Sequence, residues 1–169
     1  MRRWFRLFRT LRFYSILRQL PIQTGDDIEY WESNDWKQVK DLLVTSDIDA
    51  QPYLEDRFRF GDRFACLLNS DRLVISYGWY THRALMPISE VGLLFRTYGD
   101  AVLFDFFTPS AFQRRGYYTR LLRMITEQQN IRRAWIYVQS SNGTSSRCIE
   151  RCGFRRSSVL FLILCGRFC

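Results

Sequence analysis

The chain has 169 residues, of which 47% are hydrophobic and 17% aromatic, and this suffices for the core of one domain. The composition excludes a largely disordered chain, and no apolar run approaches the roughly 20 residues that a membrane-spanning helix needs. The net charge of +8 is concentrated at the start, where the first 18 residues contain six arginines and no acid.

This basic segment, residues 1–22, is predicted to be an amphipathic helix that forms an arm separate from a domain at 26–169. On a helical wheel its arginines lie opposite an apolar stripe. Such a helix can bind an anionic membrane surface through residues 1–20, or pack on the domain or on a second copy. A disordered arm and an organellar transit peptide are further interpretations, and no nucleic-acid partner is expected. The stripe consists of Trp4, Leu7, Phe8, Leu11 and Tyr14.

The domain shows alternating strand and helix patterns along its length. Two β-rich runs joined by a short polar turn predict a hairpin, and the turn at Gly99 predicts a second hairpin. The expected strands cover 27–31, 63–69, 73–82, 91–98, 101–109 and 134–139. One helix is expected to begin after Ser33 or Asn34. Further helices are expected at 52–59, at 117–129 and in a short segment that follows Asn142.

The most informative stretch is QRRGYY, residues 113–118, which separates an expected strand from an expected helix. The start of a helix presents unpaired N–H groups and the positive end of its dipole. Gly116 lets the backbone approach a ligand closely, and Arg114 and Arg115 add positive charge. The pattern predicts a phosphate-binding site, with a plain basic helix start as the alternative.

A second informative segment covers 134–154. Asn142 is a good residue to cap the short helix, Ser145 follows three residues later, and Gly153 ends the helix before Phe154 opens the next strand. Antiparallel strands followed by a strand–helix–strand crossover predict an α/β (α+β) sheet with flanking helices.

Together these segments resemble the GNAT superfamily of acyl-CoA N-acyltransferases. The pyrophosphate loop of that family runs Gln/Arg-x-x-Gly-x-Gly/Ala, so Gln113 and Gly116 match it and Tyr118 departs from it. The resemblance implies a central mixed, mostly antiparallel sheet. The second segment matches the family at Asn142, Ser145, Gly153 and Phe154.

The resemblance also implies the substrates. Acetyl-CoA would be the acyl donor, and the acceptor would be a primary amine on a small molecule, an amino sugar or a protein, attacking directly in a ternary complex. The loop would hold the pyrophosphate, and the preceding strand would pair with the pantetheine arm. The residues expected to bind the cofactor are Phe106, Phe107, Thr108, Gln113, Arg114, Arg115, Gly116, Tyr117, Tyr118 and Asn142.

Acyl transfer to an amine needs a general base and a proton donor for the departing thiolate. Asp105, among aromatic residues that would desolvate it, and Glu90 are the candidate bases. A polar residue at a strand rim and a loop acid are the respective alternatives. Many members of the family carry a proton-donating tyrosine on the short helix, where this chain has Ile149. Ser145, Ser146 or water could take its place.

Five cysteines and one histidine lack the spacing of a metal site, so no metal is expected, and the thiols are expected to be buried. A cytoplasmic location is expected, with a position peripheral to the inner membrane surface and a homodimer as open alternatives. Two other functions fit the sequence: a CoA-binding module that catalyses little, and a module that binds a membrane or a partner.

Overall fold

The computed structural model describes residues 5–16, 28–49, 53–88, 93–129, 131 and 133–166. Four α-helices lie in these parts: α1 (Trp36–Thr45), α2 (Leu54–Arg59), α3 (Tyr117–Gln128) and α4 (Gly143–Arg151). The strands there are β1 (Phe5–Ile16), β2 (Glu29–Ser33), β3 (Arg63–Leu68), β4 (Val74–Thr81), β5 (Leu85–Ile88), β6 (Leu93–Arg96), β7 (Ala101–Phe107), β8 (Ala134–Gln139) and β9 (Arg155–Gly166).

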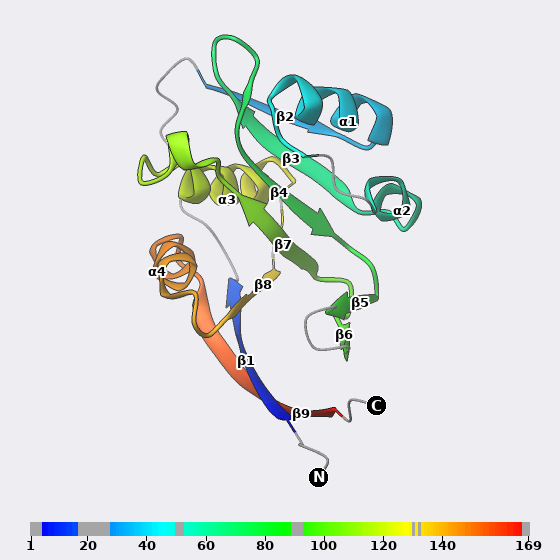
Figure 1. The fold of residues 1–169 in the computed structure, drawn as a ribbon, viewed down its shortest axis with the longest axis vertical. Coiled ribbons are helices and arrows are strands. Elements are labelled where there is room, and N and C mark those ends of the chain that lie inside the picture. Colours follow the sequence, from blue (N-terminus) through cyan, green and yellow to red (C-terminus); the bar gives the residue numbers. More distant parts are fainter. Residues whose placement is uncertain are drawn as a thin grey trace.

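Seven of these strands form one twisted sheet in the order β2-β3-β4-β7-β8-β1-β9 (Figure 1). Neighbours run antiparallel except β7 and β8, which are parallel because α3 connects them as a crossover. The mixed, mostly antiparallel sheet with flanking helices is therefore confirmed.

Helices cover both faces of the sheet. The side chains of β3 alternate between the two faces and therefore pack in two separate cores. Ala65 and Leu67 pack in one core with residues of α3 and α4. Phe64 and Cys66 pack in the other core with residues of α1 and α2. All four side chains are buried, so this strand reads as a continuous apolar run.

The predicted N-terminal helix is wrong, because residues 5–16 form β1. This strand lies between β8 and β9 and pairs antiparallel with both. Leu11 and Phe13 pack on one face of the sheet, and Tyr14 and Ile16 pack in the core on the other. The segment therefore belongs to the sheet and not to a separate arm. The membrane-surface interpretation assumed an amphipathic helix, and a strand paired on both sides does not support it. Residues 1–4 and 17–22 lie outside the described part.

The predicted hairpin between 91–98 and 101–109 is also wrong. The strand β6 pairs with β5 in a separate two-stranded sheet, and β7 pairs instead with β4 and β8. Phe95 of β6 stacks on Phe13 of β1, with ring centroids 5.3 Å apart. The β5–β6 hairpin is thereby packed against the N-terminal strand, a contact that local sequence could not indicate. The hairpin of β3 and β4 is confirmed.

A β-bulge interrupts β7 at its centre. Opposite β4, Trp79 pairs with Phe104 and Tyr77 with Phe107, so β7 holds one extra residue. Asp105 in the bulge has a φ of 48°. The opposing residue is Gly78, where an added Cβ would lie 2.5 Å from the Phe106 ring. Glycine thus allows the Phe106 ring to lie against the β4 backbone and accommodates the bulge.

Candidate active site

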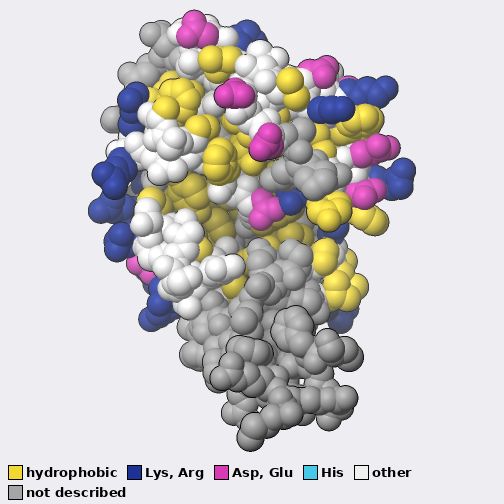
Figure 2. Space-filling model, in the orientation of Figure 1, with side chains coloured by type: hydrophobic (Ala, Val, Ile, Leu, Met, Phe, Trp, Pro, Cys, Tyr) yellow, Lys and Arg dark blue, Asp and Glu magenta, His cyan; other side chains and the backbone are white. Residues whose placement is uncertain are grey.

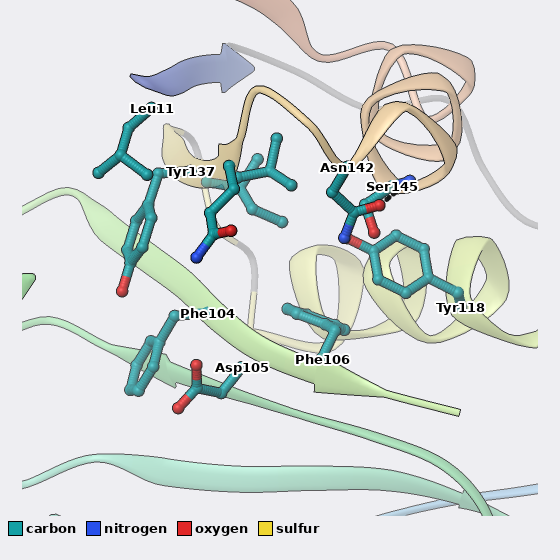
Figure 3. Close-up of a pocket in the computed structure, with 11 residues that line it drawn as sticks. Leu11, Phe104, Asp105, Phe106, Tyr118, Tyr137, Asn142 and Ser145 are labelled. Atoms are coloured by element: carbon teal, nitrogen blue, oxygen red, sulfur yellow. Dashed lines mark hydrogen bonds between the residues drawn. The ribbon is translucent and has the colours of Figure 1, made fainter. Parts of the chain in front are cut away.

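The bulge directs the end of β7 away from β8. The two strands pair only between Ala101–Leu103 and Ala134–Ile136. Beyond these residues a cavity of about 330 Å³, here called the wedge cavity, opens between them (Figure 3). Phe104 to Phe106 line it from β7, and residues 136–139 line it from β8.

A second cavity of about 470 Å³, here called the loop cleft, lies between the loop 108–116 and the starts of α3 and α4. Gly116, with a φ of 82°, immediately precedes α3. Arg114 also has a positive φ, 62°, so the loop turns sharply before the helix. The Gln113 side chain donates to the Thr108 carbonyl at 3.0 Å and fastens the loop to the strand end.

The loop cleft is suited to an anion. The first N–H groups of α3 have no partner within the helix and lie next to the positive end of its dipole. Arg114 and Arg151 add positive charge to its lining. Figure 2 shows further Lys and Arg side chains along the left edge, where α3 and α4 lie in Figure 1.

The start of α4 borders both cavities. The Asn142 side chain accepts a hydrogen bond from the Ser145 N–H at 3.0 Å, as the sequence predicted for a helix cap. Both residues line the wedge cavity and the loop cleft. Ser146 and Ile149 are buried, so they face the protein interior instead.

The structure brings most of the predicted site residues together around the loop cleft. Arg115 is exposed and does not line these cavities, and Glu90 lies outside the described residues. The predicted residues that line the loop cleft are Phe106, Phe107, Thr108, Gln113, Arg114, Gly116, Tyr117, Tyr118, Asn142 and Ser145.

Asp105 lies at the opposite end of the wedge cavity, and its surroundings differ from the expectation. Its side chain is 36% exposed and forms an ion pair with Arg57 of α2, a partner that the sequence did not predict. The Arg57 guanidinium stacks on Trp79, 4.8 Å from the ring centroid, and on Phe104, at 5.4 Å. Arg57 is held by both rings and fixes the carboxylate in turn.

A third cavity of about 320 Å³, here called the outer cleft, lies between α2 and β5. It shares Phe104, Asp105 and Tyr137 with the wedge cavity. At its base the buried Asp62 pairs with Arg83. Burial raises the pKa of the Asp62 carboxyl, and the positive charge of Arg83 opposes that shift.

Sequence reasoning missed Arg57, Asp62 and Arg83. Each is far from Asp105 along the chain, and only the fold brings α2 beside the bulge. The one usable signal is the acidic and aromatic composition of the expected helix 52–59.

Cys66, Cys148 and Cys152 are free thiols: Cys66 and Cys152 are buried, and Cys148 is half-buried. Within the described residues no group of three or more His, Cys, Asp or Glu side chains could hold a metal ion. None of the helices in that part is long and apolar enough to cross a membrane.

Solved structures share this fold. A putative GNAT acetyltransferase from Novosphingobium aromaticivorans is 16% identical, with a TM-score of 0.63, over 96% of this chain and 66% of that one. The aminoglycoside 6'-N-acetyltransferase AAC(6')-Ih from Acinetobacter baumannii is 14% identical, with a TM-score of 0.55, over 78% and 92% of the two chains.

AAC(6')-Iy, in complex with the bisubstrate analogue CoA-S-monomethyl-acetylneamine, is 13% identical, with a TM-score of 0.59, over 85% of this chain and 100% of that one. Several other similar structures are longer still, and this chain spans between 51% and 64% of their length. No curated protein matches the sequence.

The acetyltransferase (GNAT) family matches residues 25–154, which contain the bulged strand, the loop cleft and both segments that carried the resemblance. That match covers most of the chain, and the chain therefore belongs to the GNAT acetyltransferase family.

Proposed function

We propose that the protein is an N-acetyltransferase that moves an acetyl group from acetyl-CoA to a primary amine. One observation carries the proposal: the three cavities lie in series. The loop cleft and the wedge cavity share four lining residues, and the wedge cavity and the outer cleft share three. An acyl donor and an acceptor can therefore enter from opposite ends and meet in the wedge cavity.

The donor would occupy the loop cleft. Its pyrophosphate would lie on the N–H groups at the start of α3, with Arg114 and Arg151 as counter-charges. The pantetheine arm would run along Phe106 to Thr108, at the end of β7. A main-chain N–H near Phe107 would stabilise the oxyanion, and such a donor contributes about 3 kcal/mol in other acyl transfers.

The acceptor would enter through the outer cleft. Asp105 lies where this cleft meets the wedge cavity, so it is the group that would take a proton from an incoming ammonium, directly or through water. The lining also contains Asp56 and the exposed aromatic rings of Tyr53 and Phe60. Carboxylates beside aromatic faces favour a cationic amine with a ring or carbon skeleton to stack on them.

The test is an amine screen with a matched pair of variants. The panel should contain polyamines, aminoglycosides and lysine peptides, with thiol release from acetyl-CoA as the readout. Asp105→Asn should lose turnover by about 100-fold while its Kd for acetyl-CoA stays unchanged. Asp71→Asn, in the turn between β3 and β4, is the control. Equal turnover in both variants would remove Asp105 from the mechanism.

A second candidate function is a CoA-binding module with little catalysis. Its support is the bulky Tyr118 in the loop cleft and the buried Ile149 at the position where the family often has a tyrosine. Acetyl-CoA binding without thiol release across the whole panel would favour it. A cytoplasmic location and a possible homodimer stay predictions.

A further inference from the structure

The ring of Tyr118 stands where two of the cavities meet. Four residues line both the loop cleft and the wedge cavity: Phe106, Tyr118, Asn142 and Ser145. If the donor lies in one cavity and the amine enters from the other, the thioester lies at this junction. Of the four side chains, only those of Tyr118 and Ser145 carry a hydroxyl group.

The Tyr118 side chain is held in a defined direction. It starts on the first turn of α3 and packs edge-on against Phe106, with ring centroids 5.2 Å apart. Figure 3 shows its hydroxyl end pointing across the junction toward Asn142 and Ser145. Burial, and secondarily Cys152 just after α4 and Cys148 within it, raise the pKa of the Tyr118 phenol. The phenol therefore keeps its proton at neutral pH and can donate a hydrogen bond, while the same shift makes it a weak acid.

The reaction needs such a donor. The amine nitrogen forms a bond to the acetyl carbon, the carbon–sulfur bond breaks, and the sulfur leaves with the electron pair as a thiolate. One proton must reach that sulfur, and the proton lost by the amine must go to a base.

We propose that the Tyr118 hydroxyl donates a hydrogen bond to the departing sulfur as negative charge develops on it, while Asp105 takes the proton of the amine. The thiolate takes its proton from solvent, so atoms and charges balance. The Ile149 side chain of α4 has no hydrogen-bonding or acidic group and is buried in the core. A tyrosine on α3 thus supplies, from another helix, the phenol that position 149 of α4 lacks. This inference rests on the proposed N-acetyltransferase function.

The test compares Tyr118→Phe with Tyr118→Ala. Phenylalanine keeps the ring on Phe106 and removes only the hydroxyl, whereas alanine also opens the junction. Tyr98→Phe, at a position that is 80% exposed, removes the same atom far from the cavities and serves as the control. Turnover is measured as thiol release with the best amine of the panel, and as hydrolysis of acetyl-CoA without amine. Hydrolysis breaks the same carbon–sulfur bond. The Kd for acetyl-CoA comes from calorimetry.

Tyr118→Phe is expected to lower kcat by about 100-fold in both assays, with KM and Kd within about twofold of wild type. A kcat within about threefold of wild type would overturn the proposal, as would a Tyr118→Ala variant that is faster than wild type, because the ring would then only obstruct the junction. Wild type that neither binds nor cleaves acetyl-CoA would instead overturn the proposed function, and this inference with it.

Discussion

Arg57 on α2 forms an ion pair with Asp105 in the bulge of β7, and this contact joins the helix at the outer cleft to the strand at its base. Arg57 in turn lies over the rings of Trp79 and Phe104. The carboxylate is therefore fixed in place, with Arg57 as the counter-charge beside which an incoming ammonium would have to bind.

Replacing Arg57 tests this coupling. Arg57→Met keeps an apolar stem over the Trp79 ring and removes the charge. We expect kcat/KM for the amine to fall by about tenfold, with stability reduced by about 1 kcal/mol, because the pair is only partly buried. Arg59→Met, on the exposed side of α2, is the control and should change stability by less than about 0.5 kcal/mol. Unchanged amine kinetics in Arg57→Met would show that Asp105 needs no partner.

Gly78 is expected to tolerate no side chain. A Cβ there would lie 2.5 Å from the Phe106 ring, so Gly78→Ala should cost about 1–3 kcal/mol in chemical unfolding and weaken acetyl-CoA binding. Gly143→Ala is the matched control, since its Cβ would meet only the Arg147 side chain at 3.9 Å. The double variant Gly78→Ala/Phe106→Ala should cost less than the sum of its single changes. Additive losses would mean that the two residues do not oppose each other.

Removing residues 1–16 should abolish the native fold. The deletion takes β1 out of the sheet and exposes the edge of β8, while Leu11, Phe13, Tyr14 and Ile16 leave the core. Near-ultraviolet circular dichroism should lose its tertiary signal, and thermal melting should lose cooperativity. A truncated protein that melts cooperatively and binds acetyl-CoA would show that β1 is dispensable.

Cys148 of α4 and Cys152, the residue that follows α4, should differ in reactivity. Burial raises the pKa of the Cys152 thiol to about 11, and Arg123 and other contacts only partly offset this. The thiolate is the reactive form, so alkylation of Cys152 in the native state should be slow at pH 8 and rise about tenfold per pH unit toward pH 11. Because the unfolded state ionises this thiol at lower pH, stability should fall as pH rises through this range.

Mass spectrometry after brief iodoacetamide treatment checks the order of reaction. Cys148, which lines the loop cleft, should be modified before Cys152 at pH 8 and be protected by acetyl-CoA. Equal modification of both residues at pH 8, with or without the ligand, would contradict the placement of α4 beside the cleft.

Local sequence signals were sufficient for β8 and the start of α4. The strand 134–139 matches β8 residue for residue, and Asn142 caps α4 as predicted. In both cases a complete signal, a short apolar run or a capping side chain, lies within a few residues. The first helix was also found, although its cap is Asp35 and not Ser33 or Asn34.

The N-terminal strand could not be recognised in the same way. Its apolar residues fit a helical period, but β1 is a central strand that buries Leu11 and Phe13 on one face and Tyr14 on the other. A strand buried on both faces has no clean alternation, so only its neighbours β8 and β9 determine its structure. The Arg57–Asp105 ion pair could not be predicted for a related reason. The two residues are far apart in the chain, and only the folded sheet brings α2 to the bulge.

The most direct test of the account is acetyl-CoA binding, measured by calorimetry for wild type, Gly116→Trp and Gly99→Trp. Both glycines have a positive φ and no atom within 4 Å of an added Cβ, so the two substitutions strain the backbone alike, and only Gly116 lies in the loop cleft. The account predicts micromolar binding by wild type and Gly99→Trp, and none by a folded Gly116→Trp. No binding by folded wild type, or equal binding by all three proteins, would contradict it.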